Sequence, residues 1–226
     1  MNDNKTAHMA TEYDRKVSAT IPNYEFFHRE TIDLVKAVSP KCETWLDTGC
    51  GTGTFAICAM DSFKNTQFLL SDPSNEMLAI LNTKIEGMNL NVKVLESVPS
   101  HKISLPDSSV DVITAIQSHH YYDAEGRKSA TRNSLRMLKP GGIYVTFENI
   151  RPLTDKGTST GLLRWKHFQM SMGKSEKEAE NHLERFGNEY FPITIEEHLK
   201  LLREAGFNAV EIFWYSYMQA GFYAIK

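Results

Sequence analysis

The sequence predicts a single α/β domain with a mostly parallel seven-stranded sheet, helices on both faces and a C-terminal antiparallel hairpin. Short apolar runs alternate with amphipathic stretches from Trp45 onward. This alternation is typical of parallel strands joined by covering helices. Only residues 216–219 separate the last two apolar runs, which is too short for a parallel crossover, so these runs should pair as a hairpin. The length of 226 residues suits one large domain.

Each predicted element follows from its own local pattern. The predicted strands are Glu43–Asp47, Thr66–Ser71, Asn91–Glu96, Val110–Ile116, Gly142–Glu148, Ala209–Tyr215 and Ala220–Ile225. The predicted helices are Phe55–Phe63, Ser74–Gly87, Gly126–Leu138 and Thr194–Ala205. Thr194 and Glu197 form a capping box at the start of the last helix. The run Lys139-Pro140-Gly141-Gly142 should end the third helix and turn the chain into the next strand.

Two segments lie outside this alternation, Met9–Lys36 and Arg151–Pro192. Open α/β sheets bind ligands beyond the carboxyl ends of their strands, and both segments leave or approach that edge. We therefore expect them to cover a site within one domain of residues 1–226; the alternative is that they only cover apolar surface. The aromatic side chains that we expect in this cover or in the substrate site are Tyr13, Tyr24, Tyr121, Trp165 and Phe168.

The most informative motif is the run Asp47-Thr48-Gly49-Cys50-Gly51-Thr52-Gly53, between a predicted strand and a predicted helix. Glycine has no Cβ, so the backbone of such a turn can approach a ligand closely, and the helix N-terminus adds unpaired N–H groups. A glycine turn without a ligand is the alternative, but glycines so close together lower stability unless they are used.

Spacing separates the ligands that bind such turns. The nucleotide triphosphate loop requires a Gly-Lys-Ser/Thr sequence, which does not follow here. The dinucleotide fingerprint survives only in a weakened register, in which Ala56 replaces the third glycine. The remaining pattern, D-x-G-x-G-x-G, resembles motif I of the class I S-adenosylmethionine (SAM) methyltransferases. The resemblance implies a Rossmann-like fold with SAM as the cofactor and S-adenosylhomocysteine (SAH) as the product.

Under this resemblance, each part of SAM has an expected partner. Asp47 would hold the methionine ammonium directly or through water, and the backbone of the turn would approach the methionine portion. Asp72, about 25 residues later at the end of the second strand, suits bidentate hydrogen bonds to the ribose hydroxyls. Its alternative role is an N-cap or Asx turn before Ser74. The full set of expected cofactor contacts is Asp47, Gly49, Cys50, Gly51, Gly53, Asp72, Pro73, Met77, Ser97, Val98 and Gln117.

Four of these contacts, Met77, Ser97, Val98 and Gln117, rest on arguments of their own. Met77 could pack on the adenine or simply in the core. Ser97 and Val98 end the third strand, where this fold usually reads the adenine edge. Gln117 resembles the family's cofactor-contacting position after the fourth strand.

Two histidines, His119 and His120, follow that fourth strand and are the candidate general bases, because imidazole titrates near neutral pH. Adjacent side chains point in different directions, so at most one should face the substrate. The alternative is that both only pack or form hydrogen bonds. We expect no metal site, since no third ligand stands at a suitable spacing.

Within the class, the chain resembles carboxy-SAM synthase and related wobble-uridine enzymes. The similar stretches are Tyr13-Asp14, Ile21-Pro22-Asn23-Tyr24, Lys166–Ser175 and Glu204-Ala205-Gly206-Phe207. In that subfamily an arginine and a tyrosine engage the extra carboxylate of carboxy-SAM, where this chain has Met170 and Lys174. This departure favours plain SAM.

Composition limits the partners and the compartment. The net charge of −3, without a lysine or arginine run, disfavours tight nucleic-acid binding. The cysteines Cys42, Cys50 and Cys58 lack a zinc spacing and suit a reducing cytoplasm. We expect neither a signal peptide nor a membrane span.

The sequence thus favours a SAM-dependent methyltransferase acting on a small molecule. The alternatives are a tRNA wobble-uridine-modifying enzyme and a SAM-binding module without catalysis. A homodimer is an option, while the acceptor molecule, the acceptor atom and the use of a general base stay open.

Overall fold

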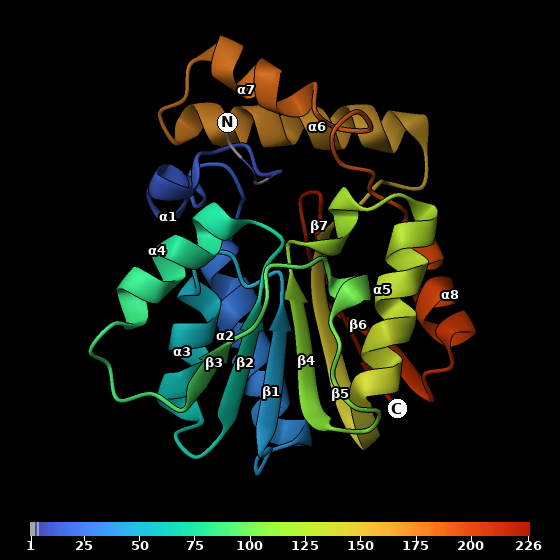
Figure 1. The fold of residues 1–226 in the computed structure, drawn as a ribbon. Helices are drawn as coiled ribbons and strands as arrows, with labels where there is room; N and C mark the ends of the chain where they lie inside the picture. Colours follow the sequence, from blue (N-terminus) through green and yellow to red (C-terminus); the bar gives the residue numbers. More distant parts are fainter. Residues whose placement is uncertain (1–2, 4) are drawn as a thin grey trace.

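The computed structural model describes residue 3 and residues 5–226, and it confirms the predicted sheet (Figure 1). The strand order is β3-β2-β1-β4-β5-β7-β6, and β7 runs antiparallel to both of its neighbours, β5 and β6, while the other pairs are parallel. The strands are β1 (Thr44–Thr48), β2 (Gln67–Ser71), β3 (Val92–Val94), β4 (Val110–Ile116), β5 (Leu138–Asn149), β6 (Ala209–Ser216) and β7 (Gln219–Ile225). The C-terminal hairpin of β6 and β7 is therefore confirmed.

The four predicted helices are present, with ends within two residues of the prediction. They are α3 (Thr54–Ser62), α4 (Asn75–Ile85), α5 (Ala124–Met137) and α8 (Ile195–Ala205). Thr194 forms the predicted capping box with Glu197. Two strand boundaries were wrong: β3 is shorter than predicted, and β5 begins at Leu138 because that residue already pairs with Val110 of β4.

Side chains of successive strand residues build two cores, one on each face of the sheet. Trp45 of β1 packs with Phe55 of α3 and Phe27 of α2 (Tyr24–Val38) on one face. Leu46, the next residue, packs with Met137 of α5 and Leu202 of α8 on the other. The period of two is what a strand covered on both faces requires, and it fixes the register that brings the strand ends together.

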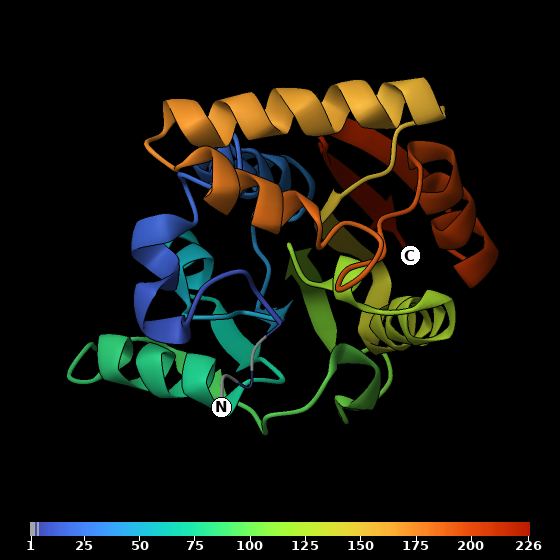
Figure 2. The same cartoon turned by 90° about the horizontal axis from the view of Figure 1, so that it is seen from above.

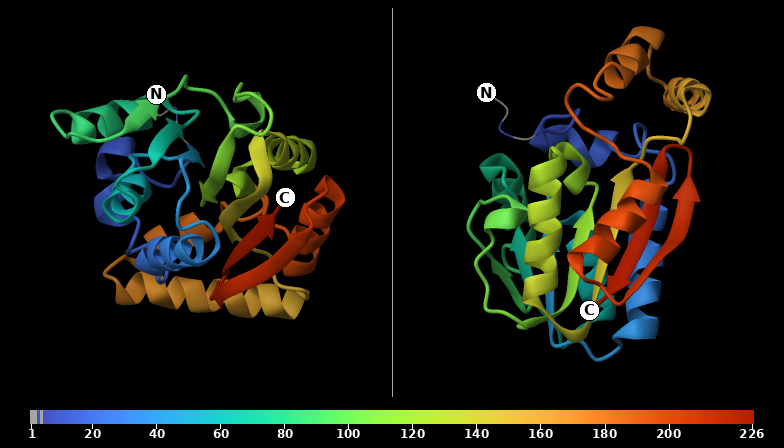
Figure 3. Two further views of the ribbon diagram at one scale, coloured as in Figure 1. Left: turned by 90° about the horizontal axis from the view of Figure 1, so that it is seen from below. Right: turned by 90° about the vertical axis from the view of Figure 1, so that its right-hand side faces the viewer.

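The segments outside the alternation contain helices that the sequence did not reveal. These are α1 (Tyr13–Lys16), α2, α6 (Asp155–Ser171) and α7 (Glu176–Leu183), with the 3-10 turn η1 (Ala10–Glu12) before α1. Two further 3-10 turns lie outside these segments: η2 (Ser100–Lys102) precedes β4, and η3 (His119–Tyr121) follows it. Helices α1, α6 and α7 lie beyond the carboxyl ends of the strands (Figures 1 and 3). Seen from above, α6 runs along one side of the molecule, with α7 beside it (Figure 2).

The first segment is therefore only partly a cover. Helix α2 belongs to the body of the domain, because Phe27, Thr31 and Val35 are buried against the sheet and the Phe27 ring stacks on Phe147 at 4.6 Å between centroids. Within the described residues, no helix combines the length and apolar character needed to cross a bilayer.

Candidate active site

A cavity of about 850 Å³, here called the glycine-turn cavity, opens where β1, β2 and β4 end. Strands β1 and β4 are adjacent in space but not in sequence, and open α/β sheets bind ligands at such a switch point. The residues that line the cavity are Asp3, Lys5, Thr6, Tyr13, Gly49, Gly51, Asp72, Pro73, Ser74, Met77, Pro99, His101, Ile116, Gln117, Ser118, Tyr121, Tyr122, Asp123, Glu125, Gly126, Ser129 and Phe191.

The three glycines of the turn have different tasks. A Cβ on Gly49 would lie 2.5 Å from Ser118 Cβ, and one on Gly53 would lie 2.3 Å from Leu81 Cδ1, so both glycines allow close packing. A Cβ on Gly51 would meet nothing within 4 Å, although its φ of +53° still favours glycine. Gly51 therefore presents bare backbone to the cavity and is the glycine best suited to approach a ligand.

Asp72 combines a structural task with a place in the cavity wall. Its Oδ1 accepts a hydrogen bond from the Ser74 N–H at 2.9 Å, as an Asx turn does, and its Oδ2 accepts one from the Gly51 N–H at 2.8 Å. Burial raises the pKa of Asp72 to about 6 despite these bonds, and the nearby Asp3 carboxylate adds to the rise. Each carboxylate oxygen keeps a lone pair with which it could accept a ligand hydroxyl.

Asp47, in contrast, lies in the interior at the end of β1. Its Oδ1 accepts a hydrogen bond from Thr114 Oγ1 at 2.8 Å, and burial raises its pKa to about 7. It is not among the residues that line the glycine-turn cavity. A direct bond from Asp47 to a ligand ammonium would therefore need a rearrangement, whereas a water-mediated one is compatible with the expectation.

Of the expected cofactor residues, the structure brings Gly49, Gly51, Asp72, Pro73, Met77 and Gln117 together in one cavity wall. It does not place Asp47, Cys50, Gly53, Ser97 or Val98 there. Val98 packs against the second core, and the buried Ser97 Oγ has no partner within the described residues. The interpretation of Ser97 and Val98 as adenine contacts stays a prediction.

Gln117 has the features expected of a ligand-binding residue: a strained backbone and a buried side chain without hydrogen-bond partners among the described residues. Its backbone has φ +55°, a left-handed conformation that non-glycine residues rarely adopt. Its side chain is 9% exposed, and neither its Nε2 nor its Oε1 has a hydrogen-bond partner within the described residues. A buried amide without hydrogen-bond partners destabilises the folded state. A bound ligand that forms hydrogen bonds with Gln117 would remove this cost.

Both candidate bases are buried outside the cavities. His119 Nε2 lies 3.1 Å from Ser100 Oγ and its Nδ1 lies 3.0 Å from Tyr144 Oη, while burial lowers its pKa to about 4. His120 Nδ1 lies 2.7 Å from Glu148 Oε2. Neighbouring polar groups form hydrogen bonds with both rings, as in the alternative role of packing or hydrogen bonding. The interpretation of either histidine as a general base stays a prediction.

A small chamber of about 30 Å³, here called the tyrosine chamber, adjoins the glycine-turn cavity. It shares Thr6, Tyr13, Gln117 and Tyr121 with that cavity. Tyr190 closes another side, and its buried hydroxyl has no partner within the described residues. The other lining residues are Ala7, His8, Val17, Thr20, Ile21, Asn149, His182 and Arg185. Two buried polar side chains of this wall, Gln117 and Tyr190, thus have no hydrogen-bond partner within the described residues.

The other aromatic residues expected in the cover have different places. Trp165 is fully buried, and its Nε1 donates a hydrogen bond to Thr20 O at 2.6 Å. Phe168 packs on Tyr217, and Tyr24 packs on Phe27 and His28. None of these lines the glycine-turn cavity or the tyrosine chamber. They hold the cover in place, while Tyr13 and Tyr121 form the cavity wall.

Sequence reasoning missed part of the wall, notably the N-terminal Asp3, Lys5 and Thr6. Asp3 Oδ2 accepts a hydrogen bond from the Asn75 N–H at 2.8 Å, at the start of α4. No local pattern announces this contact, because it joins residues 72 positions apart. Within the described part of the chain, no cluster of three or more His, Cys, Asp or Glu could hold a metal ion.

A family model described as a methyltransferase domain matches residues 46–142, which contain the glycine turn, Asp72 and Gln117. Residues 46–142 thus form a methyltransferase domain, and the matches support a class I SAM-dependent methyltransferase. This methyltransferase shares its fold with a SAM-dependent methyltransferase of Thermotoga maritima, with a TM-score of 0.62 and 20% identity over 96% of this chain and 95% of that one.

Curated relatives refine the resemblance of this methyltransferase. A carboxy-SAM synthase of Nautilia profundicola is 23% identical over 204 residues, covering 90% of this chain and 86% of the relative. A demethylmenaquinone methyltransferase of Thermus thermophilus is 31% identical over 144 residues, covering 63% of this chain and 61% of the relative. The predicted resemblance to carboxy-SAM synthase is thereby confirmed.

Proposed function

We propose that this methyltransferase transfers the methyl group of SAM to a small-molecule acceptor whose reacting atom enters the tyrosine chamber. One observation carries the proposal: the buried, unpartnered amide of Gln117 belongs to the walls of both the glycine-turn cavity and the tyrosine chamber. A cofactor in the first and an acceptor in the second would meet at this residue.

The residues present fit SAM. The bare backbone at Gly51 leaves room for the methionine portion, and the carboxylate of Asp72 is placed to accept hydrogen bonds from ribose hydroxyls. Pro73 and Met77 supply apolar surface for the adenosine end. When bound, SAM supplies a methyl group already activated by its sulfonium.

The chain itself would contribute alignment and exclusion of water. Holding two reactants in line can supply a large part of the barrier reduction, on the order of 7–11 kcal/mol in favourable cases. Tyr13, Tyr121 and Tyr190 line the chamber. Burial raises the pKa of each of these tyrosines, that of Tyr121 to about 12. These tyrosines would therefore be neutral and would orient the acceptor by hydrogen bonds.

The two histidines would act indirectly in this scheme. The His120 Nδ1–H donates to Glu148, and its Nε2 lies 3.3 Å from the side-chain amide of Asn149, which lines the chamber. We propose that His120 positions Asn149. We propose also that His119 stabilises its own turn, η3, through its contacts with Ser100 and Tyr144.

Binding and turnover can be tested separately. Isothermal titration should show one SAM or SAH site, and Gln117→Leu should weaken it or abolish transfer, while Gln67→Leu, at the exposed start of β2, should do neither. Isotope-labelled SAM offered with small-molecule extracts and with bulk tRNA should label a small molecule. Label in tRNA, or SAM binding without any transfer, would contradict the proposal.

A second candidate rests on the relatives named carboxy-SAM synthase, which align along most of the chain. In that case the chain would modify SAM itself. Mass spectrometry of SAM recovered after expression of the chain separates the two functions, because carboxy-SAM is heavier than SAM by one carboxyl group in place of a hydrogen.

A further inference from the structure

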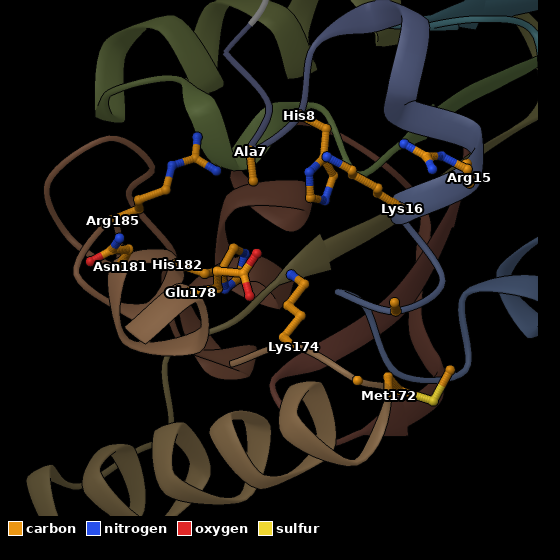
Figure 4. A pocket seen from close by; sticks show the side chains of 12 residues that line it. Ala7, His8, Arg15, Lys16, Met172, Lys174, Glu178, Asn181, His182 and Arg185 are labelled. Carbon is orange, nitrogen blue, oxygen red and sulfur yellow. The ribbon is translucent and has the colours of Figure 1, made fainter. Parts of the chain in front are cut away.

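A third cavity, here called the basic cavity, lies between α1 and the α6–α7 pair and has a volume of about 660 Å³ (Figure 4). Its lining residues are Ala7, His8, Arg15, Lys16, Ala19, Met172, Gly173, Lys174, Glu178, Asn181, His182 and Arg185. It is far larger than the tyrosine chamber and is walled mainly by long polar side chains.

Positive charge dominates this wall. Four cationic side chains line it, Arg15, Lys16, Lys174 and Arg185, against the single carboxylate of Glu178. Arg15 and Lys16 share one partner outside the wall, Glu12, at 3.0 and 2.7 Å. Arg185 pairs with Glu189 at 2.6 Å. The cavity therefore carries more positive than negative charge even after its flanking carboxylates are counted.

Lys174 differs from the other cations of the wall. Within the described residues it has no carboxylate within 4 Å; its Nζ donates hydrogen bonds to Thr20 Oγ1 at 2.7 Å and to Gln169 Oε1 at 2.8 Å. An ammonium group has three protons, so one stays available for a ligand. Burial lowers the pKa of Lys174 to about 8, as expected for a cation held without a counter-ion.

Gln169 links Lys174 to His182, which also lines the tyrosine chamber. Its Nε2 donates to His182 Nδ1 at 3.0 Å, which leaves the ring proton of His182 on Nε2. Burial lowers the pKa of His182 to about 3, so the ring is a neutral donor at pH 7. His182 lines both the basic cavity and the tyrosine chamber, together with Ala7, His8 and Arg185.

The three cavities thus adjoin one another through shared wall residues. The basic cavity shares residues with the tyrosine chamber, and the chamber shares Tyr13, Gln117 and Tyr121 with the glycine-turn cavity. A chamber of about 30 Å³ holds little more than one small group, so the remainder of an acceptor must extend elsewhere. With the glycine-turn cavity assigned to the cofactor, the basic cavity is the other large space that adjoins the chamber.

We propose that the basic cavity binds an anionic group of the methyl acceptor, a carboxylate or a phosphate, with Lys174 as its principal contact. The inference rests on the proposed function and names the class of its acceptor. An anion there would take the free proton of Lys174 and face Lys16 and Arg15, while the reacting atom lies in the tyrosine chamber.

The test is isothermal titration of the full-length, SAH-saturated protein with inorganic phosphate and, separately, with succinate. Succinamide, the neutral isostere of succinate, is the charge control. We expect one or both anions to bind and succinamide not to bind; binding of phosphate alone indicates a phosphate group, and binding of succinate alone a carboxylate.

Variants then locate the anion. Lys174→Met should weaken anion binding by about tenfold or more, the loss expected for a charge-assisted hydrogen bond, and Lys174→Arg should restore most of it. Lys166→Met is the matched control, because Lys166 lies on α6 and pairs with Glu176 and Glu180 outside the cavity. If Lys174→Met does not fold, Lys16→Met should show the same direction of change.

A pH series adds a readout specific to this lysine. Anion binding should weaken above about pH 8 in the wild type, where Lys174 loses its proton, and persist in Lys174→Arg. Equal anion binding in Lys174→Met and the wild type, equal binding of succinamide, or no anion binding would overturn the inference. Loss of SAH binding alone would contradict the proposed function, and titration of the SAH-free protein would then still decide the basic cavity.

Discussion

The carboxylate of Asp72, at the end of β2, accepts a hydrogen bond from the backbone N–H of Gly51 at 2.8 Å. One bond therefore joins the glycine turn to the acidic residue that the sequence predicts as the ribose partner. The same carboxylate caps the turn before α4 through Ser74. The alternatives of a structural and a ligand-binding Asp72 are thus compatible, since one oxygen pair can serve both.

Replacing Asp72 tests its ligand-binding task. We expect Asp72→Ala to weaken SAH binding by about 1–3 kcal/mol, because two charge-assisted hydrogen bonds to the ribose would be lost. Isothermal titration measures the affinity, and Asp61→Ala, at an exposed carboxylate of α3, serves as the control. Unchanged affinity in Asp72→Ala would mean that other residues hold the ribose.

Asp47 should make the stability of the ligand-free protein depend on pH. Burial raises its pKa from 3.8 to about 7, so between these values the folded state holds a proton that the unfolded state has lost. Stability should therefore fall as pH rises from about 4 to 7, by up to about 4 kcal/mol from this group. The penalty is absent below pH 4 and complete above pH 7.

Asp47→Asn should remove that penalty, because the amide cannot ionise. Denaturant unfolding at pH 5 and pH 8 should show a smaller loss of stability with rising pH in the variant than in the wild type. The comparison with the wild type is needed because buried neutral histidines, such as His28 and His198, have lowered pKa values and act in the opposite direction. Parallel pH profiles for the two proteins would contradict the prediction.

Glu148 should be essential for stability. It accepts hydrogen bonds from His120 Nδ1 at 2.7 Å, from Thr146 Oγ1 at 2.5 Å and from the backbone N–H groups of His119 and His120. Its hydrogen bond with His120 lowers its pKa to about 2, although burial opposes this. Glu148→Ala leaves these buried donors unsatisfied and should cost about 3–5 kcal/mol.

Denaturant unfolding tests this, with Glu211→Ala, at an exposed position of β6, as the control. A loss for Glu148→Ala no greater than for the control would show that water replaces the lost acceptor. Since the folded-state pKa of Glu148 is lowered, its stabilisation should be present above about pH 4.5 and should disappear as pH falls towards 2.

The sheet and its helices could be predicted because each depends on local periodicity. Trp45 and Leu46 point to opposite faces simply because they are neighbours in a strand, and both cores follow from that alternation. The glycine-turn cavity was also partly predictable, since Gly51, Asp72 and Gln117 lie within three residues of the ends of strands whose carboxyl ends meet at one edge.

The acceptor side could not be predicted in the same way. Lys174, Thr20 and His182 are brought together only when α1 docks against the α6–α7 pair, and such long-range contacts leave no periodic signal. The partners of His119 and His120 could not be predicted either. The residue type suggested a general base, but the partners Tyr144 and Glu148 lie on β5, about 25 residues further along the chain.

Asp14 should couple the N-terminal cover to the glycine turn. Its Oδ1 accepts hydrogen bonds from Thr52 Oγ1 and Thr54 Oγ1, both at 2.7 Å, and its Oδ2 lies 2.5 Å from Lys84 Nζ. Since α1 carries Tyr13 into the cavity wall, loosening α1 should loosen the site. We expect Asp14→Ala to weaken SAH binding by about threefold to tenfold, the loss expected for one or two partly exposed hydrogen bonds.

Limited proteolysis gives an independent readout of the same change. Cleavage near α1 should be faster in Asp14→Ala than in the wild type and should be slowed less by SAH. Asp33→Ala, at an exposed position of α2, is the matched control. If Asp14→Ala matched the control in both SAH affinity and cleavage rate, α1 would be held by its apolar contacts alone, and the link between the glycine turn and the cover would have no part in cofactor binding.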